Sequence, residues 1–334
     1  MSTLASYFND ALTNIEPDTD KANAATAHAE VTELLKASKE LEGLGLDPIL
    51  IGSYAREVSI KRVKDVDVFV RMESPDTNAT PEDVLSLFEG VLSKDDNYGS
   101  ERIEKQHRSI KIDFSDYDLT VDVVPARRKG ENWEVPSVPD DEESEWIETN
   151  PVLLNEKTTE LNQLNTINDK GIYVPVVKLI RQTRRTWLGD QPGGLFFELM
   201  TYWGFKNSKW SATSIAEYYT LALEYIASNL SDIAKFGLDD PTIPGKSIST
   251  KADDNDFTVA KVAMDEASKL AREALEDEDD CSSALKWQKL LGKTPDGEYV
   301  FQMPSYCNAD GTKKNASNIT SGARNVPAGN DRYA

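Results

Sequence analysis

Residues 51–71 read IGSYAREVSIKRVKDVDVFVR and place two acidic residues within an apolar run. Asp65 and Asp67 flank Val66, and the apolar residues that follow predict a strand over residues 66–70. An ionised carboxylate on a buried strand is unfavourable unless a partner compensates its charge. A bound cation is one such partner, so this stretch raises the question of a metal-dependent site.

The composition describes an ordinary globular chain. Its 334 residues suit one large or two moderate domains, and 39% of them are hydrophobic. We expect no membrane association, because there is no apolar run near ~18 residues and the N-terminus lacks the pattern of a secretory signal. The two cysteines, Cys281 and Cys307, predict neither a disulfide framework nor a CxxC site. They therefore favour a cytoplasmic, reducing location.

Charge and histidine content exclude other classes of function. The formal net charge is −21, and contacts to phosphates along a duplex need clustered Lys and Arg. We therefore expect no extended surface for duplex nucleic acid, although a small basic pocket remains compatible with this charge. Only His28 and His107 are available for histidine-based catalysis, and neither lies in a recognisable catalytic setting.

The pattern of apolar residues divides the chain into a mixed first part and a helical second part. Strands and a hairpin fall within the first part, and we expect Pro125 to end the hairpin and the acidic run of residues 136–148 to be a solvated loop. The predicted strands cover residues 47–52, 66–70, 109–114 and 119–125. The predicted helices cover residues 20–42, 53–57 (a single turn), 81–93, 174–187, 195–205, 214–230, 257–276 and 282–291.

A third acid extends the pattern of the opening stretch. Side chains two residues apart on a strand point to the same face, so Asp65 and Asp67 are directed together. Asp122 occupies a similar apolar frame, Thr-Val-Asp-Val-Val, in a second predicted strand. If the two strands are neighbours, three carboxylates converge, and such a set suits magnesium shared with substrate phosphates. This arrangement predicts phosphoryl transfer.

Polar and basic residues nearby fit the same chemistry. Gly52 allows close approach of the backbone to a phosphate, and Ser53 offers a hydroxyl. Lys178 and Arg181 lie three residues apart on one face of a predicted helix, from which they can reach a triphosphate. Each feature alone has a simpler explanation: an isolated DxD is usually a surface turn, Gly-Ser carries little information, and the two basic residues suit a solvated helix face. Their combination in one order and spacing is far more specific.

These residues resemble a known family. GSYAREVSI, DVDVFV and VDVVPA look like the motifs of the nucleotidyltransferase superfamily related to DNA polymerase β. More narrowly, the chain resembles the cGAS/DncV-like nucleotidyltransferases (CD-NTases), the oligonucleotide cyclases of CBASS with a SMODS-type catalytic domain. WIETNP and VPVVKLIRQTRR resemble two further segments of that family. The resemblance spans roughly residues 20–290.

The resemblance implies a fold as well as an activity. The fold is α+β: a polymerase β-like nucleotidyltransferase lobe with a mixed sheet and a long spine helix, packed against a helical C-terminal lobe. The corresponding boundaries are 1–170 for the catalytic lobe, 171–303 for the helical lobe and 304–334 for a flexible tail. The activity is template-independent synthesis of a cyclic di- or trinucleotide from nucleoside triphosphates, with release of pyrophosphate, in defence against phage.

Roles carried over by position follow from the same resemblance. Asp65, Asp67 and Asp122 would be catalytic and would bind two Mg²⁺ ions, with Mn²⁺ as an alternative. Gly52 and Ser53 would hold the donor triphosphate, with Lys178 and Arg181 at the family's basic phosphate contacts. The substrates would be ATP, GTP or pyrimidine triphosphates. CBASS regulatory or conjugating proteins would be the partners.

The sequence departs from the family at several positions. Many members have Thr where this chain has Val58, and many have Lys-Ser where it has Gly193 and Gly194. Backbone amides could take the place of the missing serine hydroxyl. Tyr202 and Tyr218 are the candidates for stacking on a base.

Two alternatives remain open on the sequence alone. One is an RNA- or tRNA-directed transferase of the CCA-adding or poly(A) type, against which the acidic composition and the absence of an evident RNA-binding extension count. The other is a non-catalytic nucleotide sensor, against which the complete set of three acids counts.

Overall fold

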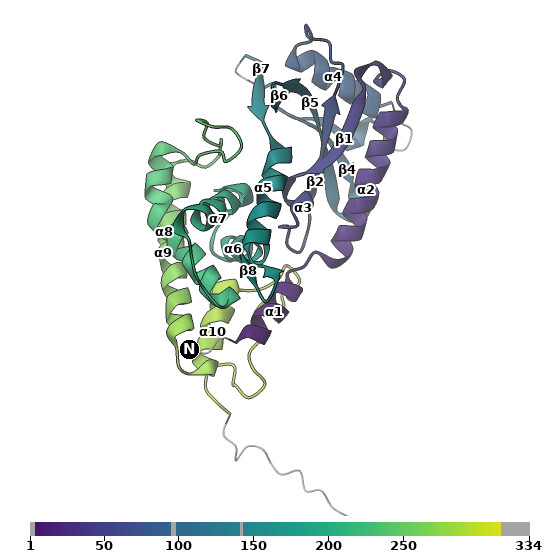
Figure 1. Cartoon of the computed structure of the whole chain (residues 1–334). Coiled ribbons are helices and arrows are strands. Elements are labelled where there is room, and N and C mark those ends of the chain that lie inside the picture. The colour runs from purple at the N-terminus through teal and green to yellow at the C-terminus, as the bar shows by residue number, and fades with distance from the viewer. Residues whose placement is uncertain (1–3, 95–97, 141–142, 315–334) are drawn as a thin grey trace, which may run out of the picture.

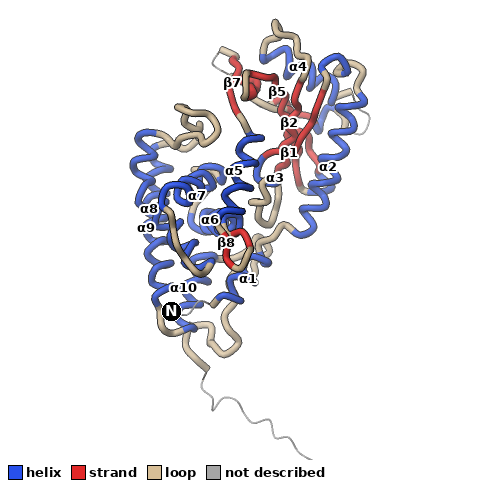
Figure 2. Tube along the Cα trace, viewed as in Figure 1, coloured by secondary structure: helices blue, strands red, loops and turns tan. Residues whose placement is uncertain are grey.

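The chain folds into two lobes, as shown by a computed structural model that describes residues 4–94, 98–140 and 143–314. Figure 1 shows the strands gathered at one end, helices packed together at the other, and α5 (Pro151–Leu164) running between them. Figure 2 makes the same division by element type. The predicted α+β fold is confirmed. None of the helices in these ranges has the length and apolar character needed to cross a membrane.

A seven-stranded mixed sheet forms the first end of the molecule, called here the sheet lobe together with the helices that cover it. Strands β2 and β5 run parallel at its centre, and the other pairs are antiparallel, in the order β1-β2-β5-β4-β3 with β6 joining β5 to β7. The strands are β1 (Leu46–Ile51), β2 (Asp65–Met72), β3 (Ile103–Lys105), β4 (Ile110–Phe114), β5 (Leu119–Lys129), β6 (Asn132–Ser137) and β7 (Glu145–Thr149).

Alternation along β2 gives the sheet two different faces. Val66, Val68 and Val70 are fully buried against the long spine helix α2 (Asp18–Ala37) and against α4 (Pro81–Leu92). Helix α4 begins with a capping box between Thr80 and Asp83, which satisfies backbone donors in its first turn. Because both helices cover the valine face, the aspartates of β2 lie on the opposite face.

The helical lobe packs around α7, which is buried along most of its length. Of the helices that were predicted, α6 matches its expected boundaries within one residue. The lobe contains α1 (Ala5–Asn14), α6 (Tyr173–Trp187), α7 (Gly194–Ser208), α8 (Ile215–Phe236), α9 (Asp254–Glu276) and α10 (Asp280–Leu291). Between α5 and α6 lies a short ribbon of β8 (Thr166–Ile167) and β9 (Lys170–Gly171), and a single turn, α3 (Gly52–Ala55), follows β1.

The N-terminal helix α1 packs with the helical lobe, although the predicted boundaries placed residues 1–170 together. Phe8 of α1 packs edge-on against Trp287 and Phe301, with ring centroids 5.0 and 5.2 Å apart. The chain therefore begins in one lobe and crosses to the other at the start of α2. This crossing had no signal in local sequence, because it depends on residues nearly 300 positions away.

Two predictions about strands were wrong. Strand β5 continues to Lys129 and does not end at Pro125. The proline is accommodated because the pairing of β5 with β4 ends at Val123, which leaves a ladder on only one side. The acidic run of residues 136–148, predicted as a loop, is partly strand. Pro136 and Ser137 end β6, and residues 145–148 lie in β7, which pairs with β6.

The C-terminal part also differs from expectation. Cys281 and Cys307 are joined by a disulfide with their Cα atoms 5.4 Å apart, so the prediction of no disulfide framework was wrong. This bond, with a turn from Asn308 to Thr312, fixes residues 304–314, the first part of the predicted flexible tail. Residues 315–334 lie outside the described ranges.

Candidate active site

Three carboxylates share one face of the two central strands. Strands β2 and β5 run parallel with Asp67 directly opposite Asp122. Asp65, two residues before Asp67, projects from the same side of the strand. The sequence-based expectation that these strands are neighbours is therefore correct, and it brings together acids that are 55 residues apart in the chain.

Basic groups near the carboxylates offset their charge only in part. Arg56 lowers the pKa of Asp67, and Lys111, opposite Asp122 in the strand register, lowers the pKa of Asp122, but burial and like charges outweigh both. Burial, followed by the charges of Asp65 and Asp122, raises the pKa of Asp67 to about 7. Burial and the charge of Asp65 raise the pKa of Asp122 to about 6. The Oδ1 atom of Asp122 is also buried without a hydrogen-bond partner. Such a group of acids carries uncompensated negative charge and therefore favours the binding of a cation.

The donor set suits a divalent ion bound together with a nucleotide. In the described ranges, no group of three or more acidic, histidine or cysteine side chains is arranged to hold a metal ion by itself. Magnesium does not need such a cage, because it commonly binds through one or two carboxylates, waters and substrate phosphates. The unpartnered oxygen of Asp122 and the repulsion felt by Asp67 therefore fit this kind of ion.

The Gly-Ser turn lies directly against the acids. Gly52 adopts a φ of +75°, and a Cβ atom added there would lie 1.9 Å from Oδ2 of Asp67. Glycine is therefore required both by the backbone conformation and by the carboxylate. Next to it, Ser53 accepts a hydrogen bond from the hydroxyl of Ser59, with the oxygens 3.0 Å apart. Ser59 was not identified from the sequence.

A buried cluster of Arg56, Glu198 and Arg181 joins the two lobes behind this turn. Arg56, which follows α3, donates to both carboxylate oxygens of Glu198 on α7, at 2.6 and 3.1 Å. Glu198 is fully buried, and Arg181 on α6 lies 3.6 Å from its Oε2 atom. Two arginines thus share one carboxylate, which leaves a net positive charge. Burial also lowers the pKa of Arg181, which Glu198 opposes.

The two predicted phosphate-contacting bases lie in different places. Arg181 lines a cavity of about 680 Å³ between the lobes, together with Gly52, Ser53, Asp65 and Asp67. Asp122 lies beside Asp67 by strand register but does not line this cavity. Lys178 is not brought into it either. It pairs with Glu16 and lines a separate cavity of about 230 Å³.

Gly193 and Gly194 also line the cavity between the lobes. Gly193 is the N-cap of α7 and provides no side-chain cap, so the first amides of this 15-residue helix have no side-chain acceptor there. The guanidinium of Arg181 lies over the same turn, since a Cβ atom added to Gly194 would be 3.1 Å from it. Amides and guanidinium together suit an anion.

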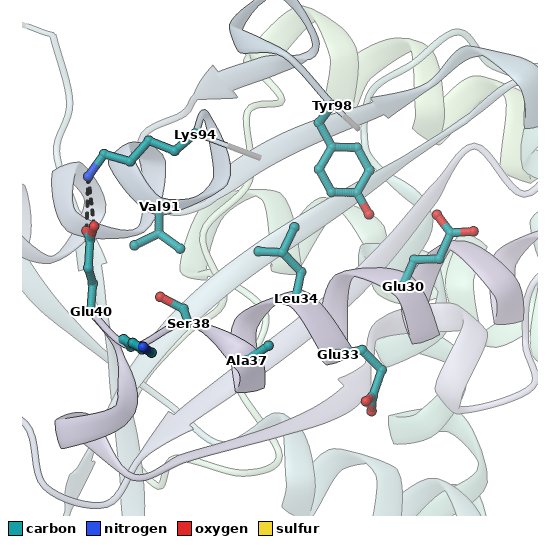
Figure 3. A pocket seen from close by; sticks show the side chains of 10 residues that line it. Glu30, Glu33, Leu34, Ala37, Ser38, Glu40, Val91, Lys94 and Tyr98 are labelled. Atoms are coloured by element: carbon teal, nitrogen blue, oxygen red, sulfur yellow. Dashed lines mark hydrogen bonds and ion pairs between the residues drawn. The ribbon is translucent and has the colours of Figure 1, made fainter. Parts of the chain in front are cut away.

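A larger cavity, of about 830 Å³, lies on the other side of the sheet lobe between α2 and α4. Figure 3 shows Glu30 and Glu33 around it, with Lys94 paired to Glu40. The carboxylates of β2 and β5 face away from this cavity. Because the three aspartates and the Gly-Ser turn lie on the opposite face of the sheet, the cavity between the lobes is the candidate active site.

Comparisons with known proteins agree with this geometry. The model of the Second Messenger Oligonucleotide or Dinucleotide Synthetase (SMODS) domain matches residues 1–162. The cyclic AMP-AMP-AMP synthase of an Acinetobacter strain is 27% identical, over 87% of this chain and 84% of that protein. The cyclic AMP-AMP-GMP synthase of Enterobacter hormaechei is 24% identical, over 86% of this chain and 91% of that protein. The structure of CdnC from Escherichia coli MS115-1 with ATP has the same fold, with a TM-score of 0.65 at 18% identity, over 89% of this chain and 98% of that one.

Proposed function

This chain belongs to the cGAS/DncV-like nucleotidyltransferases, and we propose that it joins nucleoside triphosphates into a cyclic di- or trinucleotide with release of pyrophosphate. The product serves as a second messenger in CBASS defence against phage. Regulatory or conjugating partner proteins and a cytoplasmic location stay predictions. The observation that supports the proposal most directly is the placement of Asp65, Asp67 and Asp122 on one face of two adjacent strands, beside Gly52.

The three aspartates are the proposed metal ligands. Members of this family generally depend on divalent metal ions. Asp65 and Asp67 would hold two Mg²⁺ ions, for which Mn²⁺ is an alternative, and Asp122 would contribute to the ion nearest the attacking hydroxyl. Ions held by these aspartates would supply neutralisation of the charge that develops during the transfer. Because the acids lie on two strands of one sheet, their spacing is set by the fold.

The remaining residues bind and orient the triphosphate. Gly52 allows the backbone to approach it, Ser53 offers its hydroxyl, and Arg181 contributes charge from the helical lobe. Arg181 is suited to this role because Arg56 occupies both oxygens of Glu198 at shorter distance, which leaves donors of Arg181 available. Positioning and charge neutralisation are the main requirements of phosphoryl transfer.

The test is identification of the product. The purified protein is incubated with all four nucleoside triphosphates and Mg²⁺, and the products are resolved by mass spectrometry and nuclease digestion. We expect a nuclease-resistant cyclic product and stoichiometric pyrophosphate. The matched control is the Asp65→Asn and Asp67→Asn double variant, which keeps side-chain size and removes the charge. Only linear product, or transfer to added tRNA, would refute the proposal in favour of a polymer-directed transferase.

A further inference from the structure

The loop between α8 and α9 contributes to the cavity that holds the catalytic acids. Asp240, Thr242 and Ile248 of this loop line that cavity. Figure 1 shows the loop extending from the ends of α8 and α9 toward the region of α5 and β7. An ion pair between Lys246 and Glu148 of β7, at 3.4 Å, joins it to the sheet lobe. The loop therefore forms part of the wall of the nucleotide cavity.

This loop is held by its own hydrogen bonds. The indole of Trp203 donates to the carbonyl of Asp239 at 2.9 Å. The amide of Asp240 donates to the carbonyl of Lys246 at 2.8 Å, and Thr242 is buried. A side chain on such a loop presents a defined group to a ligand before the ligand arrives.

The carboxylate of Asp240 has one occupied oxygen and one available oxygen. Its Oδ1 atom accepts hydrogen bonds from the amide and the hydroxyl of Thr242, at 2.7 and 2.6 Å. Within the described ranges, Oδ2 accepts no hydrogen bond from the protein. Because Thr242 fixes the orientation of the carboxylate, Asp240 offers a single acceptor to a ligand in this cavity.

The apolar part of the same cavity is suited to a nucleobase. Phosphates belong near the Gly-Ser turn and Arg181, where amides and positive charge are available. A base instead requires apolar contact for its faces and a small number of polar groups for its edge. The apolar lining comes from both lobes and from the loop itself, namely Pro151, Leu154, Leu195, Leu199 and Ile248.

We propose that Asp240 selects nucleoside triphosphates by one group on the edge of the base. It favours the amine at C6 of adenine or C4 of cytosine over the keto oxygen at C6 of guanine or C4 of uracil. This inference rests on the proposed function, because it concerns the base of the same substrate. The amine of adenine donates one hydrogen bond to the available Oδ2 atom. A keto oxygen in that position faces a carboxylate and can make no hydrogen bond with it.

Guanine turned to present its N1–H and N2–H groups is also disfavoured. Two parallel donors are best matched by both oxygens of a carboxylate. Oδ1 of Asp240 already accepts two hydrogen bonds from Thr242, so the bidentate arrangement displaces them. Discrimination therefore depends on the pairing between Asp240 and Thr242 as well as on charge.

The variant Asp240→Asn tests this directly. Its amide oxygen can still accept from Thr242, and its NH₂ group then replaces the acceptor with a donor. In competition between equimolar ATP and GTP, we expect the ratio of adenine to guanine in the product to fall by about tenfold or more. The matched control is Asp239→Asn, whose side chain is exposed and does not line the cavity. It should keep the wild-type ratio.

Binding measurements separate this inference from the proposed function. With Ca²⁺ in place of Mg²⁺, the Kd values for ATP and GTP are measured for the wild-type protein and for Asp240→Asn. We expect the variant to weaken ATP binding about tenfold relative to GTP, whether or not a cyclic product is ever found. An unchanged ratio of the two Kd values, or an unchanged product ratio in an active variant, overturns the selection by Asp240.

Discussion

Two groups of charged side chains lie close to the same Gly-Ser turn, and they differ in exposure and in how their charges are balanced. Asp65, Asp67 and Asp122 are like charges on one face of the sheet, and two of them have raised pKa values. Arg56 and Glu198 form a bidentate pair between the lobes, with short distances and almost no exposure. The charges of Arg56 and Lys111 only partly offset the repulsion within the first group, whereas in the second group Arg56 and Glu198 compensate each other.

This difference in charge balance distinguishes side chains that stabilise the fold from side chains that bind a ligand. A buried ion pair that satisfies its own hydrogen bonds requires nothing further, so Arg56 and Glu198 hold α3 against α7. Unbalanced acids are destabilising for the folded chain and become favourable only when a cation arrives. The lack of compensation at the aspartates is therefore the feature that indicates function.

The largest expected effect concerns the three aspartates, whose charges are not balanced. Asp65→Asn combined with Asp67→Asn should reduce cyclic product formation by about 10³-fold or more, because removing a catalytic electrostatic contact typically costs 10²–10³-fold in rate. The same change should leave the thermal unfolding temperature unchanged or raised, because it removes like-charge repulsion. Product formation and calorimetry measure the two effects. A large loss of stability would contradict the distinction between the groups.

Breaking the Arg56–Glu198 pair should instead reduce the stability of the fold. Glu198→Ala leaves Arg56 buried without its partner, so we expect a loss of about 3–5 kcal/mol in the free energy of unfolding. Denaturant unfolding measures this loss. The control is Glu224→Ala, which breaks a bidentate pair with Arg272 at 2.8 Å that is more than a third exposed. That change should cost about 0–1 kcal/mol. Equal losses in the two variants would show that burial does not distinguish these pairs.

The raised pKa of Asp67 predicts an effect of pH on stability when divalent ions are absent. Between its ordinary value of 3.8 and about 7, the folded state holds a proton that the unfolded state has lost. The free energy of unfolding therefore falls as the pH rises through this window. Relative to Asp67→Asn, the wild-type protein should lose about 1–3 kcal/mol from pH 4 to pH 7, at about 1.4 kcal/mol per pKa unit.

Addition of Mg²⁺ at pH 7 completes this test. An ion that binds only the folded chain should raise the unfolding temperature of the wild-type protein more than that of Asp67→Asn. Chelation should reverse the gain. A pH-independent difference between the two proteins, with no response to Mg²⁺, would mean that the acids are balanced by a group of the protein itself.

The sequence alone identified the three aspartates as a candidate site, but it did not predict that Arg56 pairs with Glu198. Strand alternation around Asp65, Asp67 and Asp122 is a local pattern, whereas the pairing of β2 with β5 was a condition of the sequence argument that the structure meets. Arg56 and Glu198 are 142 residues apart on a turn and a helix, and neither position has a periodic signal. Their pairing depends on how the lobes pack, which no local pattern encodes.

The same limit explains the other differences. The disulfide between Cys281 and Cys307 depends on a turn after α10 that brings the two residues together. The path of α1 depends on Trp287 and Phe301 in the helical lobe. Lys178 and Arg181 are three residues apart on α6 and were expected to act together. The exact rotation of that helix directs Arg181 into the cavity between the lobes and Lys178 into another.

Substitution of Lys178 and Arg181 gives the smallest expected effect, and it tests whether only the arginine beside Glu198 contacts the triphosphate. Arg181→Met should raise KM for ATP about 10–100-fold, because a hydrogen bond to a charged group contributes about 1.5–3 kcal/mol. Lys178→Met should change KM by less than about threefold, since Lys178 pairs with the half-exposed Glu16 outside the nucleotide cavity. Steady-state kinetics with both variants measures the contrast. Equal increases in KM would place Lys178 among the phosphate contacts, and the charge available to the triphosphate would then extend beyond the arginine that shares Glu198.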